Sequence, residues 1–390
     1  MQVRIDLDRE YGIVLEGGGA RGAYQVGAWK ALREAGVKIK GIAGASVGAL
    51  NGALMCMDEL EKAEQIWGNL TYSDVMNIDN SLMEQFHELG QDVFRTKQLV
   101  KGLRELGENA VKIVREGGFD ITPLRGLLRE SVDEDRIRNS DRELYVTTFS
   151  VDEKKEIVLD VKRAPEGEMA DALMASAYFP AFRNEKLGGK RYMDGGSLNN
   201  VPVNVLLERD YRDIIVIRIY GFGFDTEKVL TIPEGVSVSH IAPRQDLGGI
   251  LEFNKKRISR NMQLGYLDAQ RFLYGLAGRS YYLDAPRTEG YYFDKMMSEL
   301  ALVRHLIKSE LEESELQKLE GYRTFTEQIF PALAAELKLK PDWDYKTLYL
   351  AVLEEWAKEL KMPRMQIYTP DDIMAKVHER LRKLDIVLPI

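Results

Sequence analysis

The sequence has one cysteine, Cys56, among its 390 residues, and it has no excess of basic residues. A single thiol excludes a disulfide framework and a zinc site built from several cysteines, and it favours a reducing compartment. Lys and Arg number 54 against 62 Asp and Glu, so the net charge is -8. This balance argues against a nucleic-acid-binding protein that is held by a broad basic face.

Long hydrophobic runs are also lacking. The longest apolar stretch, residues 42–57, is interrupted by Ser46, Asn51 and three glycines. It is shorter than the roughly 20 residues that cross a bilayer. The first residues of the chain carry charges where a secretory signal needs an apolar core. We therefore expect a cytoplasmic protein whose membrane contacts, if any, are peripheral.

Apolar residues make up 45% of the chain. Strand and helix patterns alternate near its start. A strand pattern at residues 11–16 is followed by glycines and a helical pattern at 23–35. The same order recurs with a strand at 37–43 and a helix at 49–60. This alternation predicts an α/β fold with a mostly parallel sheet. Further strands are expected at residues 144–151, 155–161 and 214–219.

Two segments differ from this pattern. Residues 65–140 are mostly polar and helix-forming, which predicts a helical cap inserted into the main domain. From about residue 291 onward every pattern suits helices, the last of which begins with Thr369 as its N-cap and Pro370 at its first position. The sequence thus predicts one domain over residues 1–290 and a helical C-terminal extension over residues 291–390.

The pentapeptide from Gly44 to Gly48 fits the pattern G-x-S-x-G between a predicted strand and a predicted helix. Small residues on both sides of Ser46 allow a sharp turn that exposes the serine oxygen, which indicates a nucleophile. The helix that follows would also offer amide donors to an oxyanion. The alternative interpretation is that Ser46 only caps this helix.

A glycine-rich loop from Gly17 to Gly22 follows the first predicted strand and fits G-x-G-x-x-G. A dinucleotide-binding turn would need an acidic residue near the end of the second strand, but residues 37–43 contain neither Asp nor Glu. We instead expect the loop amides to form a nest for the oxyanion created when Ser46 attacks an acyl group. Arg21 could steady this loop, add positive potential or form a surface salt bridge.

A serine nucleophile needs a base, and the histidines are poorly placed for that role. His240 lies in a loop-like stretch, whereas His87, His305 and His378 lie in helix-forming segments. The other candidate is Asp194, because the glycines that follow it would let its carboxylate approach another loop closely. Taken alone, Asp-Gly-Gly is also consistent with a simple turn.

Together these motifs resemble those of the patatin-like phospholipases. That family has four sequence blocks in a fixed order, and this chain has counterparts of all four, at residues 17–22, 44–48, 175–180 and 194–196. The resemblance covers about residues 10–220, and the tail is similar to that of bacterial members. It implies a three-layer α/β fold, with a mostly parallel central sheet flanked by helices and an additional helical region at the C-terminus.

The resemblance also implies roles for individual residues. Ser46 would be the nucleophile and Asp194 its only partner, in a Ser-Asp dyad without histidine. Ser176, in the third block, is expected to pack beside the site, and no metal or other cofactor is implied. The residues expected in or near the oxyanion hole are Gly17, Gly18, Gly19 and Arg21, and the supporting motif glycines are Gly22, Gly44, Gly48, Gly195 and Gly196.

These inferences predict a serine acyl hydrolase of lipid metabolism that cleaves phospholipid or lysophospholipid esters through an acyl-enzyme intermediate. The expected partner is a lipid or acyl-ester substrate and not a nucleic acid. Two alternatives stay open. One is a catalytically silent lipid-binding or scaffold protein, and the other is an esterase that depends on a histidine, for which His240 is the candidate.

Overall fold

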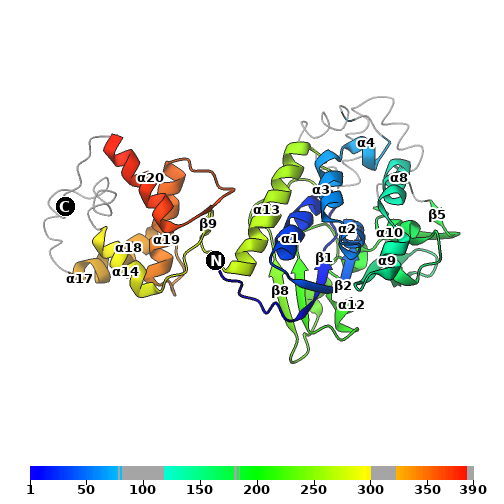
Figure 1. The fold of residues 1–390 in the computed structure, drawn as a ribbon, viewed down its shortest axis with the longest axis horizontal. Helices are drawn as coiled ribbons and strands as arrows, with labels where there is room; N and C mark the ends of the chain where they lie inside the picture. Colours follow the sequence, from blue (N-terminus) through cyan, green and yellow to red (C-terminus); the bar gives the residue numbers. More distant parts are fainter. Residues whose placement is uncertain (78–79, 81–117, 180–181, 184, 300–321, 384–390) are drawn as a thin grey trace. The chain divides into compact units, whose positions relative to one another are not determined.

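The computed structural model describes residues 1–77, 80, 118–179, 182–183, 185–299 and 322–383. The chain divides into two compact units (Figure 1). The larger unit is Val3–Leu273, and the C-terminal unit is Tyr274–Ile390 together with Met1–Gln2. The domain boundary expected from the sequence, between residues 290 and 291, stays a prediction.

The larger unit is built on a mixed sheet with the strand order β5-β6-β3-β2-β1-β7-β8, in which β4 also pairs with β3. Pairing is parallel between β1 and β2, β1 and β7, β2 and β3, and β7 and β8, and antiparallel where β4, β5 and β6 join. The mostly parallel sheet expected from the sequence is therefore confirmed, whereas β5, β6 and β8 were not predicted. The strands are β1 (Glu10–Leu15), β2 (Lys38–Ala45), β3 (Glu143–Ser150), β4 (Lys155–Asp160), β5 (Lys186–Leu187), β6 (Lys190–Asp194), β7 (Asp213–Ile217) and β8 (Ser237–Ile241).

Helices cover both faces of this sheet, as a three-layer α/β fold requires. On one face lies α2 (Val47–Cys56), whose Gly52 sits over Ile42 and Leu15. On the other face lies α12 (Val203–Leu207), which joins Val14 of β1 in one buried cluster. Neighbouring residues of β1 thus face opposite layers, because side chains alternate along a strand. The three-layer architecture is confirmed.

The remaining helices of the larger unit include α1 (Ala23–Glu34) and α13 (Lys255–Tyr274), which lie side by side (Figure 1). They approach closely because a Cβ at Gly27 would overlap the backbone of Met262, and one at Gly265 would overlap that of Tyr24. The helix expected at residues 49–60 is wrong in its bounds. α2 starts at Val47 and ends at Cys56, and Asp58 (φ 57°) turns the chain into the next helix.

The predicted helical cap lies partly outside the described residues, which omit 78–79 and 81–117. Its described parts are helical or short loops. The helices are α3 (Leu60–Asn69), α4 (Tyr72–Val75), α8 (Thr122–Ser131) and α9 (Glu134–Asn139). Shorter elements elsewhere in the unit are η1 (Gly19–Gly22), η2 (Val161–Arg163), α10 (Met169–Ser176), α11 (Gly196–Asn199) and η3 (Thr226–Val229).

The C-terminal unit is mainly helical, as expected, but it also contains one short parallel pair, β9 (Tyr282–Leu283) with β10 (Ile367–Tyr368). Its own buried cluster includes Phe330, Leu353 and Trp356. Residues 300–321 and 384–390, where the sequence also predicts helices, lie outside the described residues. The described helices are α14 (Glu289–Ser298), α17 (Tyr322–Thr324), η4 (Phe325–Ile329), α18 (Phe330–Glu336), α19 (Tyr345–Glu359) and α20 (Pro370–Lys383).

None of the helices in the described ranges combines the length and the apolar character needed to cross a bilayer.

Candidate active site

Ser46 occupies a strained turn between β2 and α2. Its backbone has φ 52° and ψ -124°, a conformation that a residue with a side chain rarely adopts. Such strain is typical of a nucleophile elbow, in which the serine oxygen is pushed out of the turn. The turn fits because Gly48 passes so close to Leu15 of β1 that a Cβ there would overlap the Leu15 carbonyl oxygen.

The sheet brings Asp194 next to this turn. Ala45, the last residue of β2, is paired with Thr147 of β3, and Asp194, the last residue of β6, is paired with Thr148. Because Thr147 and Thr148 are consecutive, the ends of β2 and β6 meet at neighbouring positions along β3. Two residues that are distant in the sequence therefore lie side by side.

Asp194 is buried, with 6% of its surface exposed, and Ser46 lies close enough to its carboxylate to affect its pKa. The amide of Gly196 donates a hydrogen bond to Oδ1 at 2.7 Å. Burial raises the pKa of Asp194 from 3.8 to about 6, although the Ser46 side chain and the Gly196 amide act in the opposite direction. The carboxylate is thus a better proton acceptor than an aspartate in water, and it is still ionised at neutral pH.

The glycine loop lies beside Ser46. Gly18 and Gly19 line the same cavity as the serine, and Gly19 has φ 55° and touches the Ile250 backbone so closely that a Cβ would overlap it. In the described part of the chain, no backbone partner is found for the amides of Gly18 and Gly19. The Gly17 amide, by contrast, donates to the Asn200 carbonyl at 3.2 Å, so it is not available to an oxyanion.

Asn200 also determines how the Gly18 amide points, a role that the sequence analysis missed. Its Nδ2 donates to the Gly17 carbonyl oxygen at 3.2 Å. In a trans peptide the C=O and the following N–H point in opposite directions, so this bond directs the Gly18 amide away from Asn200. Asn200 is buried, and its Oδ1 lies between the backbones of Gly17 and Gly196, which links the glycine loop to the loop after Asp194.

Arg21 does not line the cavity and instead holds neighbouring loops. Its Nε donates to the Gly248 carbonyl at 2.8 Å, and its Nη1 donates to the carbonyls of Tyr220 and Ile219. Of the roles considered for Arg21, steadying the loop agrees best with these contacts. Two other motif glycines lie where backbones pass closely, Gly44 against Gly48 and Gly195 against Thr147, whereas Gly22 lies against the side chain of Val47.

Ser176 holds the backbone of the turn at Ser46, and its hydroxyl is engaged in hydrogen bonds, so it is not a second nucleophile. Its hydroxyl donates to the Thr147 carbonyl at 2.6 Å and accepts the Ser46 amide at 2.9 Å. Its carbonyl accepts the Gly195 amide at 3.2 Å. One buried residue therefore contacts β3, the elbow and the Asp194 loop. Pro180, the last residue of the same sequence block, lies outside the described residues.

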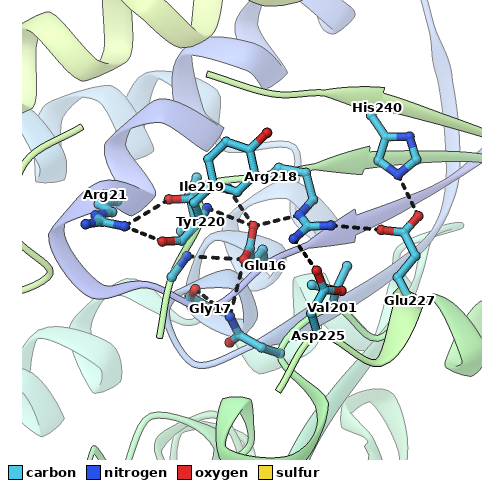
Figure 2. A network of polar contacts seen from close by, with 12 residues as sticks. Glu16, Gly17, Arg21, Val201, Arg218, Ile219, Tyr220, Asp225, Glu227 and His240 are labelled. Atoms are coloured by element: carbon cyan, nitrogen blue, oxygen red, sulfur yellow. Dashed lines mark hydrogen bonds and ion pairs between the residues drawn. The ribbon is translucent and has the colours of Figure 1, made fainter. Parts of the chain in front are cut away.

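Glu16 is a second residue that the sequence analysis missed. It follows β1 directly and is 2% exposed. Figure 2 shows its polar contacts. Its Oε2 accepts the amides of Ile219 and Tyr220 at 2.7 and 3.0 Å, its Oε1 accepts the amide of Gly221 at 3.2 Å, and Arg218 pairs with it at 3.0 Å. The signal was an acidic residue at the end of an apolar strand, because a buried carboxylate must find donors.

An apolar cavity opens at Ser46. Its walls are formed by side chains of α2, α3 and α8, such as Leu54, Trp67 and Leu128, and by Phe222 and Phe253 from later loops. Among the described residues that line it, Asp194 is the only one that carries a charge. The other polar side chains in the lining are Ser46, Asn51 and Ser131.

The described histidines are not placed to serve Ser46. His240 lies on β8, is absent from the described lining of the cavity, and its Nε2 lies 2.5 Å from Glu227 Oε1 (Figure 2). His378 lies on α20 of the C-terminal unit. His87 and His305 lie outside the described residues. The described ranges contain no group of three or more His, Cys, Asp or Glu that could hold a metal ion.

The comparisons with known proteins concern mainly the first half of the chain. A family model described as patatin-like phospholipase matches residues 13–207, which is half of the chain. Lysophospholipase nte1 of Aspergillus terreus is 60% identical over 50 residues, which are 13% of this chain and 3% of that protein. Neuropathy target esterase sws of Drosophila sechellia is 55% identical over 47 residues, 12% of this chain and 3% of that protein. The matches thus span only about 3% of the length of these curated relatives.

Two solved structures resemble the chain more loosely. VipD from Legionella pneumophila has a TM-score of 0.42 at 13% identity, covering 96% of this chain and 86% of that one. ExoU of Pseudomonas aeruginosa, solved in complex with SpcU, has a TM-score of 0.31 at 16% identity, covering 91% and 69%. The family match begins within β1, ends with α12 and includes all four motifs. It confirms the resemblance seen in the sequence, and the chain belongs to the patatin-like phospholipases, a family of lipid acyl hydrolases.

Proposed function

We propose that this protein is a serine acyl hydrolase that cleaves acyl esters of phospholipids or lysophospholipids, with Ser46 as nucleophile and Asp194 as its base. The observation that carries this proposal is the position of Ser46, in a strained turn beside a buried carboxylate of raised pKa at an apolar cavity. A nucleophile next to a base of raised pKa is the arrangement that acyl transfer requires.

In the first half of the reaction Ser46 Oγ attacks the ester carbonyl carbon, and its proton passes to Asp194. The amides of Gly18 and Gly19 stabilise the negative oxygen of the tetrahedral intermediate. Its collapse breaks the ester C–O bond and leaves an acyl group on Ser46, and Asp194 returns the proton to the departing alcohol. In the second half Asp194 takes a proton from water, the hydroxide attacks the acyl-Ser46 carbonyl, and Ser46 Oγ leaves with that proton.

The chemistry of the cavity supports a lipid substrate. Apolar side chains from α2, α3 and α8 would make dispersion contacts with the acyl chain of a lipid and remove it from water. The described lining contains no cation beside Ser46 that would bind a phosphate. The acyl chain therefore fits the cavity better than the headgroup does. The names of the two curated relatives, a lysophospholipase and an esterase, agree with an ester substrate.

The test is fluorophosphonate labelling of the full chain together with hydrolysis of a lipid panel followed by mass spectrometry. Ser46→Ala should abolish labelling, and both Ser46→Ala and Asp194→Asn should lower turnover by about three orders of magnitude or more. The double variant should be barely worse than either single one, because the two residues act as a unit. The matched control is Ser237→Ala, an exposed serine on β8, which should keep full labelling.

The alternatives make different predictions. His240→Ala should leave turnover within about twofold of the unsubstituted protein, since Asp194 and not His240 contacts Ser46. A large loss would instead favour a histidine-dependent esterase. A folded chain that neither reacts with the fluorophosphonate nor hydrolyses any lipid of the panel would favour a silent lipid-binding protein.

A further inference from the structure

Exposed apolar side chains gather in one part of the chain. Six of the nine large hydrophobic side chains that are exposed in the described residues belong to the stretch from residue 198 to residue 232. Three of them alternate with glycines after β7: Tyr220 is 55% exposed, Phe222 71% and Phe224 52%. We call these three residues the aromatic rim. Clustered exposed aromatics on a folded domain mark a surface that binds something.

The glycines between the aromatic residues bring the backbone of the rim close to the active site. Gly221 presses against Gly17, and Gly223 presses against Gly196, so closely that a Cβ at either glycine would overlap a backbone carbonyl oxygen. These two glycines therefore hold the segment against the two loops of the active site, while more than half of each aromatic side chain stays exposed.

The base of the rim is held firmly although its side chains are exposed. Glu16 accepts three consecutive backbone amides of this loop, and Arg21 donates to two of its carbonyls (Figure 2). The Phe224 backbone is bonded to Gly196 at 3.0 Å and to Asn200 at 2.9 Å. These bonds hold the backbone from which the aromatic side chains project.

The rim is continuous with the cavity of the active site. Phe222 lines the cavity that contains Ser46, and it is also the most exposed residue of the rim. Apart from Asp194 itself, the described lining between Ser46 and Phe222 contains no charged side chain, so an apolar surface leads from the serine to the outside. An acyl chain could follow this surface from a lipid aggregate to the serine.

Charges around the rim also suit a lipid surface. The two acidic residues that follow it, Asp225 and Glu227, turn inward to Arg218 at 2.7 and 2.9 Å, and their side chains are 16% and 15% exposed. Lys228 pairs with Asp225 at 3.6 Å and keeps 79% of its side chain exposed. The two acidic groups are thus compensated by cations, and the more exposed partner is a cation, which lipid phosphates attract.

We propose that the aromatic rim is the membrane-docking surface of this protein, which inserts Tyr220, Phe222 and Phe224 into the headgroup region of a lipid bilayer. Aromatic side chains are favoured at that depth. Docking places the mouth of the cavity against the bilayer, so that the ester of a lipid reaches Ser46 while its acyl chain stays among apolar groups. This inference rests on the proposed function, because it assigns the direction from which the lipid enters.

The test uses the full chain and vesicles of phosphatidylcholine with and without phosphatidylserine. Binding is measured by flotation in the Ser46→Ala background, so that no lipid is consumed. Phe224→Ser should weaken partitioning to the vesicles about tenfold, whereas Val151→Ser should not change it. Val151 is the matched control because it is also exposed and apolar but lies in the turn between β3 and β4.

Insertion itself is measured with Phe224→Trp and Val151→Trp, whose emission is followed in vesicles of brominated lipid. The emission that the Phe224→Trp substitution adds to that of the native tryptophans should be quenched. The emission that Val151→Trp adds should not be. In an otherwise unsubstituted chain, Phe224→Ser should lower turnover of vesicle lipid by about the same factor as it lowers partitioning to the vesicles. Turnover of a soluble p-nitrophenyl ester should stay the same.

Several outcomes would overturn the inference. The first is that Phe224→Ser binds vesicles as well as the parent does, and the second is that the emission of Phe224→Trp is not quenched. The third is that sedimentation shows Phe224→Ser converting a dimer to a monomer, which would make the rim a contact between copies of the chain. Failure of the proposed function is seen separately, as lipid hydrolysis that survives Ser46→Ala.

Discussion

Asp194→Asn should inactivate the protein and at the same time make it more stable at neutral pH. Burial raises the pKa of this carboxyl from 3.8 to about 6, because the charged form is removed from water. A rise of this size corresponds to about 3 kcal/mol of destabilisation once the group is ionised. Asparagine keeps the shape of the side chain but has no proton to lose.

The direction in which stability changes with pH follows from proton binding. Between pH 3.8 and about 6 the folded chain still holds a proton on Asp194 that the unfolded chain has lost. Stability therefore falls as pH rises through this window, and the loss is complete above it. Asparagine has one oxygen acceptor where the carboxylate has two, which reduces this gain in stability by about 1 kcal/mol. The variant should be about 2 kcal/mol more stable than the parent at pH 8, and this advantage should disappear toward pH 4.

The measurement is urea unfolding at several pH values, followed by hydrogen exchange of peptides within Val3–Leu273. This readout isolates the unit that holds Asp194 from the C-terminal unit, which could unfold separately. The matched control is Asp160→Asn, an aspartate on β4 of the same sheet whose side chain is 28% exposed. In parallel, kcat/KM of the parent on a soluble ester should rise with pH about a midpoint near 6.

A difference in the free energy of unfolding between parent and Asp194→Asn that stays constant from pH 4 to pH 8 would refute the reasoning. An equal pH-dependent gain in the Asp160→Asn control would refute it as well. Activity that is independent of pH across this range would remove Asp194 from the role of base.

Other predictions concern the loop, the elbow and metal ions. Gly19→Ala should lower kcat about a hundredfold or more, whereas Gly36→Ala, which also places alanine at positive φ but in open space, should change only stability. Ser176→Ala should lower kcat about tenfold without loss of fluorophosphonate labelling, because it removes the acceptor of the Ser46 amide, and a change in KM alone would contradict this role. A chelator should leave turnover of a soluble ester unchanged, and a loss that calcium restores would mean that an ion takes part.

Much of the site follows from local sequence. Strand and helix periods indicated β1, β2, α1 and the turn that contains Ser46, since each depends on neighbours a few residues away. The block at Gly44–Gly48 predicted an elbow, and the strained φ of 52° at Ser46 is consistent with it. Local periodicity failed at the end of α2, because apolar spacing continues past Cys56 while the chain turns at Asp58 in the left-handed region.

Tertiary structure decided how the parts of the site meet. No local pattern joins Ser46 to Asp194, and their contact depends on the register of β2 and β6 along β3. The same holds for Glu16, whose partners come from the loop after β7, and for the aromatic rim, whose backbone is held by the glycines that press on two other loops. The chain by itself determined the turns and the chemical groups, because backbone preferences act over a few residues. Only folding raised the pKa of Asp194 and joined it to a nucleophile, because burial and long-range pairing exist only in the assembled sheet.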